Sequence, residues 1–339
     1  MITRIGIMGF GRIGRNVFRI LHARDDIQVA AIVDIAEPEA LEYLLKFDTV
    51  HGRFPDPISV TGDSLYAKGR RIRLLQRRAP GDVDWQAMGV EIVVEATGRY
   101  RTREALQKHV EAGARRVVLT VPPRDEIDAL VVMGVNDHVL TPEHRIISNA
   151  SCTANALAPI CKVLHEEIGI ERGFLTTVHA YTNDQRLADV PHSELRRSRA
   201  AAENIIPTDT WSPRAVGRVL PALAGRLDGM ALCVPVADGS CVDLVTLMSR
   251  PVEATEVNAL VRSAAQSTMR EVIEYTEEPI VSSDVIGNSQ VFDGLSTQVL
   301  GGNMLKTVTW YDNGWGYATR VVELVGRLAA LERQSKEVA

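Results

Sequence analysis

Short apolar runs alternate with amphipathic stretches over the first 150 residues of the chain, a pattern that predicts strands and helices in turn. Strands are expected at Arg4–Met8, Val29–Val33, Val90–Glu95, Arg116–Leu119 and Leu130–Met133. Helices are expected at Ile13–Ala23 and Arg103–Ala112. Because this alternation is typical of βαβ units, we predict a parallel sheet in a first domain that ends near Ala150.

The pattern changes after Ala150. Helices are expected at Ala154–Glu167 and Val257–Ser267, and strands at Gly173–Ala180, Met230–Pro235 and Cys241–Ser249. These longer elements predict a second domain with a mixed sheet and helices on one side. The polar, arginine-rich segment from Tyr181 to Ile205 has no periodicity, and a loop of that length is usually functional.

A glycine-rich turn joins the first predicted strand to the first predicted helix. It consists of Gly9, Phe10, Gly11, Arg12, Ile13 and Gly14, and Asp34 follows it by twenty residues (34 − 14). Such glycines let the backbone approach a pyrophosphate, and an acid at that distance accepts hydrogen bonds from ribose hydroxyls. The fold class is therefore α/β, with a Rossmann-type doubly wound dinucleotide-binding domain followed by an α+β domain. Because the Asp34 carboxylate would repel a 2′-phosphate, the sequence favours NAD over NADP.

Composition and charge exclude several kinds of partner. The 339-residue chain is 45% hydrophobic and 24% charged, and its net charge of −5 gives no general attraction to nucleic acid or to a membrane surface. The basic cluster between Lys68 and Arg78 alternates with apolar residues, as in a solvated strand and turn. Four cysteines without metal-finger spacing, and an N-terminus without a leader pattern, predict a cytoplasmic protein with no metal site.

Cys152 and His179 lie 27 residues apart (179 − 152) in the predicted second domain. A thiol is a good nucleophile only as a thiolate, and a histidine can hold it ionised and then act as general acid and base. The pair therefore predicts covalent catalysis on a carbonyl. By themselves, a cysteine and a histidine at arbitrary spacing are more often structural residues, so the motifs around them decide the interpretation.

Those motifs run in order along nearly the whole chain. They are Ser151-Cys152-Thr153-Ala154-Asn155, His179-Ala180-Tyr181-Thr182-Asn183-Asp184-Gln185, Leu195-Arg196-Arg197-Ser198-Arg199-Ala200-Ala201, Asn204-Ile205-Ile206-Pro207-Thr208 and Trp310-Tyr311-Asp312-Asn313-Gly314-Trp315-Gly316-Tyr317. They closely resemble the glyceraldehyde-3-phosphate dehydrogenase family, which includes the erythrose-4-phosphate dehydrogenases. The resemblance implies an NAD-binding domain at residues 1–151 and 316–339, with the closing helix at Gly316–Arg333, and a catalytic domain at residues 152–315.

The resemblance also implies a mechanism and an assembly. The Cys152 thiolate would attack an aldehyde to give a thiohemiacetal, His179 would take the hydroxyl proton during hydride transfer to NAD, and phosphate or water would attack the resulting thioester. The backbone N–H of Cys152 and the His179 side chain would stabilise the oxyanion. A phosphorylated aldehyde as substrate, a role in glycolysis and a homotetramer in which the loop from Tyr181 to Ile205 packs between subunits are further expectations.

Further cofactor contacts are implied by the family pattern. Arg78 would lie near the adenine, and Thr97 and Thr120 would line the cofactor cleft. Asn313 would hold the nicotinamide amide, and Tyr317 would pack beside the ring. Pro191 resembles NAD-using members of the family, whereas Met8 replaces the asparagine usual before the first glycine.

The two anion sites of the family are only partly preserved in this sequence. The inorganic-phosphate site matches Ser151, Thr153, Arg196 and Thr210, but Trp211 replaces a glycine and Pro213 stiffens the same loop. The substrate-phosphate site matches Thr182 and Asp184, but Cys233 replaces an arginine.

These departures leave alternatives open. Arg214 or Arg186 could replace the missing arginine, or recognition of a substrate phosphate could be lost. Trp211 predicts a weak dependence on inorganic phosphate, and release of the thioester by water would make the enzyme erythrose-4-phosphate-like or otherwise specialised. A redox-sensing or binding protein that retains a reactive Cys152 but turns over poorly is an alternative of another class.

Overall fold

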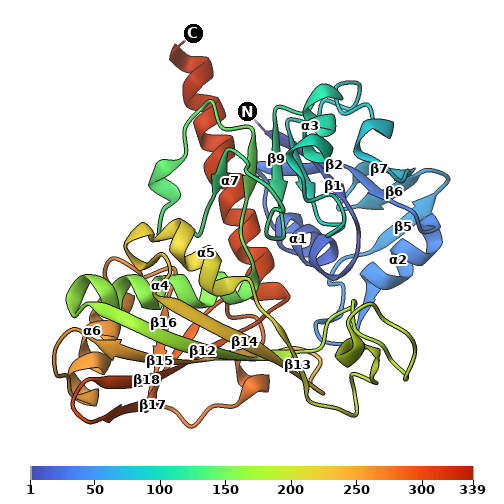
Figure 1. Cartoon of the computed structure of the whole chain (residues 1–339). Coiled ribbons are helices and arrows are strands. Elements are labelled where there is room, and N and C mark those ends of the chain that lie inside the picture. Colours follow the sequence, from blue (N-terminus) through green and yellow to red (C-terminus); the bar gives the residue numbers. More distant parts are fainter. Residues whose placement is uncertain (1, 339) are drawn as a thin grey trace. The chain divides into compact units, whose positions relative to one another are not determined.

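The computed structural model describes residues 2–338, and these divide into two units (Figure 1). The first unit contains the residues up to Val131, residues 138–150 and the residues from Ala318 onward. The second contains residues 132–137 and residues 151–317. The sequence division placed residues 132–137 in the first domain. In the structure the Lys162 ammonium donates to the carbonyls of Gly134 and Val135, both at 3.3 Å, which ties this turn to the second unit.

The first unit is built on one sheet of nine strands within the described residues. Their order is β10 (Ala129–Leu130), β11 (Ile146–Ser148), β9 (Arg116–Leu119), β8 (Ile92–Glu95), β1 (Thr3–Met8), β2 (Ile27–Asp34), β7 (Arg70–Gln76), β6 (Ser64–Ala67) and β5 (Ile58–Thr61). The chain leaves β1 toward β2 and later returns to β8 on the other side of β1. That reversal of strand order is the switch point at which doubly wound sheets bind dinucleotides.

The expectation of a wholly parallel sheet is wrong at one edge. Strands β5, β6 and β7 pair antiparallel, because the tight turn at Gly62 (φ +57°) reverses the chain between β5 and β6. Strand β7 contains the basic cluster as predicted, with buried Ile72 and Leu74 alternating with exposed arginines. The expected strand at Leu130–Met133 is also too long. It ends at Leu130 because the Asn136 side chain accepts the Val132 N–H at 2.9 Å and starts a turn.

Helices of the first unit agree with the predicted amphipathic segments. Helix α1 spans Arg12–His22 and α3 spans Arg103–Glu111, while α2 (Pro38–Lys46) and the small sheet of β3 (Phe47–Asp48) and β4 (Gly52–Arg53) had no predicted counterpart. Helix α7, which starts in the second unit, spans Trp315–Val338. Within the first unit, α7 is held by an ion pair of 3.0 Å between the buried Arg116 and Glu332.

The second unit contains a seven-stranded mixed sheet within the described residues. Its order is β13 (Ile206–Asp209), β14 (Leu227–Val234), β12 (Ile170–Ala180), β15 (Ser240–Met248), β18 (Met304–Tyr311), β17 (Val291–Leu300) and β16 (Glu274–Thr276). Helices α4 (Cys152–Glu167), α5 (Ser212–Val219) and α6 (Ala254–Gln266) pack against the sheet on one side (Figure 1). The predicted mixed sheet with helices on one side is confirmed.

Register in this sheet places two candidate residues side by side. Strands β12 and β14 are parallel, and His179 pairs with Cys233, which in turn pairs with Ile206 of β13.

Within residues 2–338, no helix is both long and apolar enough to span a membrane.

Candidate active site

The Cys152 thiol and the His179 imidazole meet at the start of α4. Cys152 is the first residue of this helix, directly after Ser151, whose side chain caps the helix by accepting the Ala154 N–H at 3.1 Å. His179 comes from the end of β12, and its Nε2 lies 3.4 Å from Cys152 Sγ. A helix N-terminus favours negative charge, so both the backbone and the histidine stabilise a thiolate here.

Hydrogen bonding selects the form of the His179 ring. Its Nδ1 lies 2.6 Å from the carbonyl oxygen of Ala180, which can only accept, so Nδ1 carries a hydrogen and Nε2 faces the sulfur. Burial lowers the pKa of His179, but the charge of Cys152, the hydrogen bond to it and the Ala180 carbonyl together outweigh burial and raise that pKa above its ordinary value. The imidazolium therefore persists to higher pH than in an ordinary histidine.

A buried hydroxyl network supports this pair from behind. The Tyr311 hydroxyl lies 2.8 Å from the Thr153 hydroxyl and 2.9 Å from the Thr177 hydroxyl, and the Tyr311 ring packs edge-on to His179. Burial, followed by the charge of Cys152, raises the pKa of Tyr311 well above its ordinary value, so it remains a neutral phenol. Thr153 is buried, and its hydroxyl belongs to this network beside Cys152.

Burial disfavours the thiolate form of the other three cysteines. All four cysteines are unpaired. Burial raises the pKa of Cys161 to about 12 and that of Cys241 to about 11. Burial also raises the pKa of Cys233, although the positive charge of Arg197 partly opposes this shift. A thiol-specific reagent at neutral pH should therefore react first at Cys152.

The glycine turn after β1 has the shape of a dinucleotide cradle. A Cβ on Gly9 (φ +90°) would lie 2.6 Å from the Thr97 nitrogen, and one on Gly14 would lie 2.1 Å from the Gly9 carbonyl oxygen. A Cβ on Gly11 would meet nothing within 4 Å, and Gly11 caps α1 without a side-chain hydrogen bond. The first turn of α1 thus has open space and N–H groups for a pyrophosphate, so the residues present fit a dinucleotide.

Asp34 links this turn to the end of β2. Its carboxylate accepts the Phe10 N–H at 2.7 Å through Oδ2, and it accepts the N–H groups of Ile35 and Ala36 at 2.7 and 3.0 Å through Oδ1. Oδ1 thus uses both of its lone pairs, whereas Oδ2 keeps one for a ribose hydroxyl. Asp34 therefore supports the turn as well as offering a negative charge.

Comparison with known proteins covers both units of the chain. Residues 3–103 match the model of the glyceraldehyde 3-phosphate dehydrogenase NAD binding domain, and residues 151–313 match that of the C-terminal domain. The chain is 50% identical to glyceraldehyde-3-phosphate dehydrogenase of Geobacillus stearothermophilus, with 97% of this chain and 99% of the relative covered. It is 48% identical to the enzyme of the same name from Priestia megaterium, over 97% and 99% of the two chains.

The chain belongs to the glyceraldehyde-3-phosphate dehydrogenase family. It is an NAD-dependent oxidoreductase of this type, as predicted from its motifs. A more distant relative, glyceraldehyde-3-phosphate dehydrogenase 2 of Streptomyces avermitilis, is 46% identical over 96% of this chain and 98% of its own length. Because these relatives share one name, they do not favour the erythrose-4-phosphate-like or the redox-sensing alternative.

Two threonines implied by the family pattern follow neighbouring strands of the first unit. Thr97 comes after β8 and Thr120 after β9, at the same carboxyl edge as the glycine turn. Arg78 lies beyond β7 with an exposed side chain, and its carbonyl accepts a hydrogen bond from the Tyr100 hydroxyl. Met8, which replaces the family's asparagine, is buried at the end of β1 and packs in the apolar core.

Asn313 and Tyr317 belong to the second unit. The Asn313 side-chain oxygen accepts the Ser240 hydroxyl at 2.8 Å, and Ser240 accepts the Ala180 N–H at 3.0 Å. This arrangement leaves the Asn313 amide NH₂ as the group oriented to donate. Tyr317 is buried at the start of α7, and burial, then the charge of Cys152, raises its pKa well above the ordinary value.

Hydroxyl groups from two helix N-termini meet beside Cys152. The Ser212 hydroxyl lies 3.4 Å from that of Ser151 and accepts from Thr210 at 3.1 Å. Ser151 caps α4, and Ser212 is the first residue of α5. The structure therefore brings Ser151 and Thr210 together as expected, and it adds Ser212, at a position where the family has alanine.

Trp211, which was expected to weaken the inorganic-phosphate site, lies beside α5. Its ring lies under the Arg218 guanidinium, 5.9 Å from ring centre to carbon, and lines a cavity of about 880 Å³ together with Arg214. Of the three hydroxyl residues above, only Thr210 lines that cavity. The indole of Trp211 is thus accommodated against α5 by its cation–π contact with Arg218.

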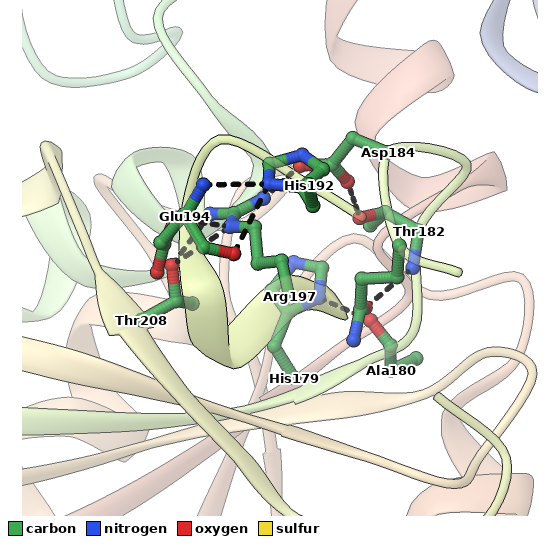
Figure 2. Close-up of polar contacts among 9 residues, drawn as sticks. His179, Ala180, Thr182, Asp184, His192, Glu194, Arg197 and Thr208 are labelled. Atoms are coloured by element: carbon green, nitrogen blue, oxygen red, sulfur yellow. Dashed lines mark hydrogen bonds and ion pairs between the residues drawn. The ribbon is translucent and has the colours of Figure 1, made fainter. Parts of the chain in front are cut away.

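Arg197, which is adjacent to the predicted Arg196, contacts a residue of the predicted substrate-phosphate site (Figure 2). It forms an ion pair with Asp184, whose other oxygen accepts from Thr182, and it contacts the Thr208 hydroxyl and Glu194, the latter at 2.6 Å. Its charge acts on the thiol of Cys233, whereas Arg196 is exposed.

The two arginines that the sequence offered as substitutes for the arginine missing at Cys233 make other contacts than Arg197 does. Arg214 lines the cavity beside Trp211, and Arg186 donates to the Pro191 carbonyl at 3.4 Å. A loop without periodicity does not indicate which of two adjacent arginines points inward, and in the structure Arg197 is half-buried and Arg196 exposed. Ser212 was not among the predicted site residues, although a hydroxyl between Trp211 and Pro213 is a signal that the sequence contains.

Proposed function

We propose that this chain oxidises glyceraldehyde 3-phosphate with NAD and inorganic phosphate to an acyl phosphate. The observation that carries the proposal is the 3.4 Å contact between Cys152 Sγ and His179 Nε2 at the N-terminus of α4. The family supports the choice of substrate, since the relatives described above carry the name of this reaction.

The chemistry follows from these two side chains. The Cys152 thiolate adds to the aldehyde carbon, and the new oxyanion accepts a hydrogen bond from the Cys152 N–H and takes the Nε2 proton of the His179 imidazolium, which gives the thiohemiacetal hydroxyl and a neutral imidazole. His179 Nε2 then takes the proton of the thiohemiacetal hydroxyl as the C–H bond breaks, which leaves a thioester on Cys152. An oxygen of inorganic phosphate attacks this thioester, and the thiolate leaves. NAD, when bound, supplies the acceptor for the hydride.

Different residues are proposed to contact different parts of NAD. The turn from Gly9 to Gly14 takes the pyrophosphate, and Asp34 takes the adenine ribose. Thr97, Thr120, Asn313 and Tyr317 take the nicotinamide half, and Arg78 lies near the adenine. The acceptor role of Asp34 and the donor role of the Asn313 amide support these assignments.

Arg197 is proposed as the cation for the substrate phosphate in place of the arginine missing at Cys233. A guanidinium has five N–H groups and pairs with phosphate oxygens in a forked geometry. Asp184 forms an ion pair with Arg197, and Thr182 supplies a hydroxyl close by. Loss of phosphate recognition is therefore not part of the proposal.

Inorganic phosphate is proposed to bind at the hydroxyl cluster of Ser151, Thr210 and Ser212, between the N-termini of α4 and α5. Peptide N–H groups at helix starts favour an anion, and the Trp211 ring packs on Arg218. We therefore replace the expectation of weak phosphate dependence with one of ordinary dependence.

The deciding experiment follows NADH formation from glyceraldehyde 3-phosphate, with and without phosphate. Wild type should turn over steadily with phosphate and stop near one NADH per active site without it, while Cys152→Ser should form none. Trp211→Gly should change this dependence little, whereas Ser212→Ala should raise the KM for phosphate severalfold. Steady turnover in phosphate-free buffer would instead support release of the thioester by water.

We also propose a homotetramer in the cytoplasm. The sheet of the second unit exposes large apolar side chains on the face opposite its helices, including Phe174 (70% exposed), Met230 and Met304. The loop from Tyr181 to Ile205 exposes Leu187 and Leu195 by more than 80% each. Such surfaces favour burial against other subunits. Four unpaired cysteines support a reducing compartment.

A further inference from the structure

Both threonines proposed to contact NAD in the first unit are hydrogen-bonded to one buried residue, Glu95. The Thr97 N–H donates to Glu95 Oε1 at 2.9 Å, and the Thr97 hydroxyl donates to the same oxygen. The Thr120 hydroxyl donates to the Glu95 backbone carbonyl at 3.0 Å. Glu95 is the last residue of β8 and is completely buried. A single residue thus determines where both hydroxyl hydrogens point.

A second pair of buried side chains holds the Glu95 carboxylate in place. The Trp85 indole N–H, which can only donate, lies 3.0 Å from His109 Nδ1. Nδ1 must therefore accept, so the ring hydrogen is on Nε2, which donates to Glu95 Oε2 at 3.1 Å. Trp85 and His109 are also completely buried. Each Glu95 oxygen consequently accepts a hydrogen bond, and the chain of donors runs in one direction from Trp85 to Glu95.

This network limits what the threonines can offer a ligand. A hydroxyl has one hydrogen to donate and two lone pairs to accept with, and in Thr97 and Thr120 the hydrogen is already committed to Glu95. Thr97 Oγ1 also accepts the Arg99 N–H at 3.1 Å, which leaves it one lone pair. Toward a ligand, both hydroxyls are therefore acceptors. They match ribose hydroxyls or a carboxamide NH₂ and do not match phosphate oxygens.

We propose that Glu95 is a positioning residue that presents Thr97 and Thr120 to NAD as hydrogen-bond acceptors, with His109 and Trp85 fixing its carboxylate. The inference rests on the NAD contacts proposed above. The strand order indicates which half of NAD is concerned: β8 and β9 lie on one side of β1, and β2 with Asp34 lies on the other. Because the pyrophosphate binds at the switch point, Glu95 acts on the nicotinamide nucleoside and not on the adenosine.

The test compares the binding of NAD with that of ADP, which lacks the nicotinamide nucleoside. In Glu95→Gln an NH₂ group replaces one oxygen, so either the Thr97 N–H or the His109 ring hydrogen loses its acceptor. We expect the Kd for NAD to rise about tenfold and the Kd for ADP to stay within twofold. Glu91→Gln is the matched control, because Glu91 precedes β8 at its opposite end, and it should leave both constants unchanged.

A double-mutant cycle separates positioning from general support of the fold. Thr97→Val alone should raise the Kd for NAD severalfold and change the Kd for ADP little. Adding Glu95→Gln to Thr97→Val should raise the Kd for NAD little further, because the effect of Glu95 passes through the Thr97 hydroxyl. An equal loss for NAD and ADP, full additivity in the cycle, or unchanged NAD binding in Glu95→Gln would overturn the proposal. If Glu95→Gln does not fold, Trp85→Phe takes its place in the same cycle, with a smaller loss for NAD only.

These binding measurements do not depend on the reaction proposed above. If wild type bound NAD but formed no NADH from glyceraldehyde 3-phosphate, the proposed function would fail while the NAD and ADP comparison would still decide the role of Glu95.

Discussion

His179 tunes the nucleophile through one short contact, and its removal has a measurable consequence. The raised pKa of His179 means that its imidazolium persists to higher pH than in an ordinary histidine, and this charge favours the thiolate 3.4 Å away. An ordinary thiol is only a few per cent thiolate at pH 7. We expect His179→Asn to slow alkylation of Cys152 at pH 7 by about tenfold or more and to move the rate profile to higher pH.

The measurement is the alkylation rate between pH 5 and 9, with the modified residue located by peptide mass. Cys152→Ser is the control, because burial disfavours the thiolates of the other cysteines and little label should then appear. Equal rates for wild type and His179→Asn at pH 7 would rule out the ion pair.

Asp34 carries a second prediction at this scale. The sequence indicated only its charge, whereas the structure shows that its carboxylate also accepts the Phe10 N–H at 2.7 Å. Asp34→Ala should therefore narrow the preference for NAD over NADP and also raise the KM for NAD, because the glycine turn loses its support. Asp34→Asn keeps an acceptor and loses the charge, so it should narrow the preference with a smaller rise in KM. The measurement is the initial rate with NAD and with NADP for each variant. If wild type used NADP as efficiently as NAD, the role of Asp34 in cofactor preference would be contradicted.

Some residues of the candidate site could be predicted from the sequence, and others could not. Cys152, His179 and Asp34 were predictable because each stands in a motif with fixed spacing to the end of a strand or the start of a helix. The inward position of Arg197 was not predictable, since it depends on contacts with Asp184 and Thr208 that only the folded loop creates.

At the scale of elements, the loop around Arg197 predicts how the substrate phosphate is recognised. Arg197→Gln should raise the KM for glyceraldehyde 3-phosphate about tenfold or more, which corresponds to about 1.4 kcal/mol of binding free energy. Arg196→Gln is the matched control, because its exposed side chain is one residue away. Cys233→Arg should leave KM unchanged or raise it, since it adds a like charge close to Arg197.

Steady-state kinetics of the three variants distinguish the possibilities. A raised KM for glyceraldehyde 3-phosphate in Arg196→Gln with none in Arg197→Gln would show that Arg196, and not Arg197, contacts the substrate phosphate. A tenfold lower KM in Cys233→Arg would show that the pocket lacks a cation.

Elements with a clear period were predictable, and those with interrupted periods were not. Helix α4 and strand β9 agree closely with their predicted ranges, because a continuous apolar pattern defines them. Strand β17 was missed: its pairing with β18 shifts register between Asp293 and Gln298, and Gly294 lies in the shift. Such a bulge breaks the alternation on which strand prediction depends.

At the scale of the whole molecule, the exposed apolar face of the second sheet predicts assembly. Phe174, Met230 and Met304 lie on the face opposite the helices, and an aromatic side chain alone can bury about 150–250 Å². If this face packs against another copy, a glutamate at its centre would place paired like charges in an apolar contact, because symmetry repeats the substitution. Phe174→Glu should therefore dissociate the proposed tetramer into smaller species.

Sedimentation velocity at micromolar concentration provides the measurement. Wild type should sediment at four times the 37.2-kDa chain mass, and Phe174→Glu at a lower multiple with its circular dichroism unchanged. Val139→Glu introduces the same charge at a 40% exposed apolar residue of the first unit and should remain tetrameric. Because the loop from Tyr181 to Ile205 contains Arg197, dissociation should also raise the KM for the aldehyde if neighbouring subunits order that loop. A monomeric wild type, or a Phe174→Glu variant that stays tetrameric, would show that this face is not a subunit contact.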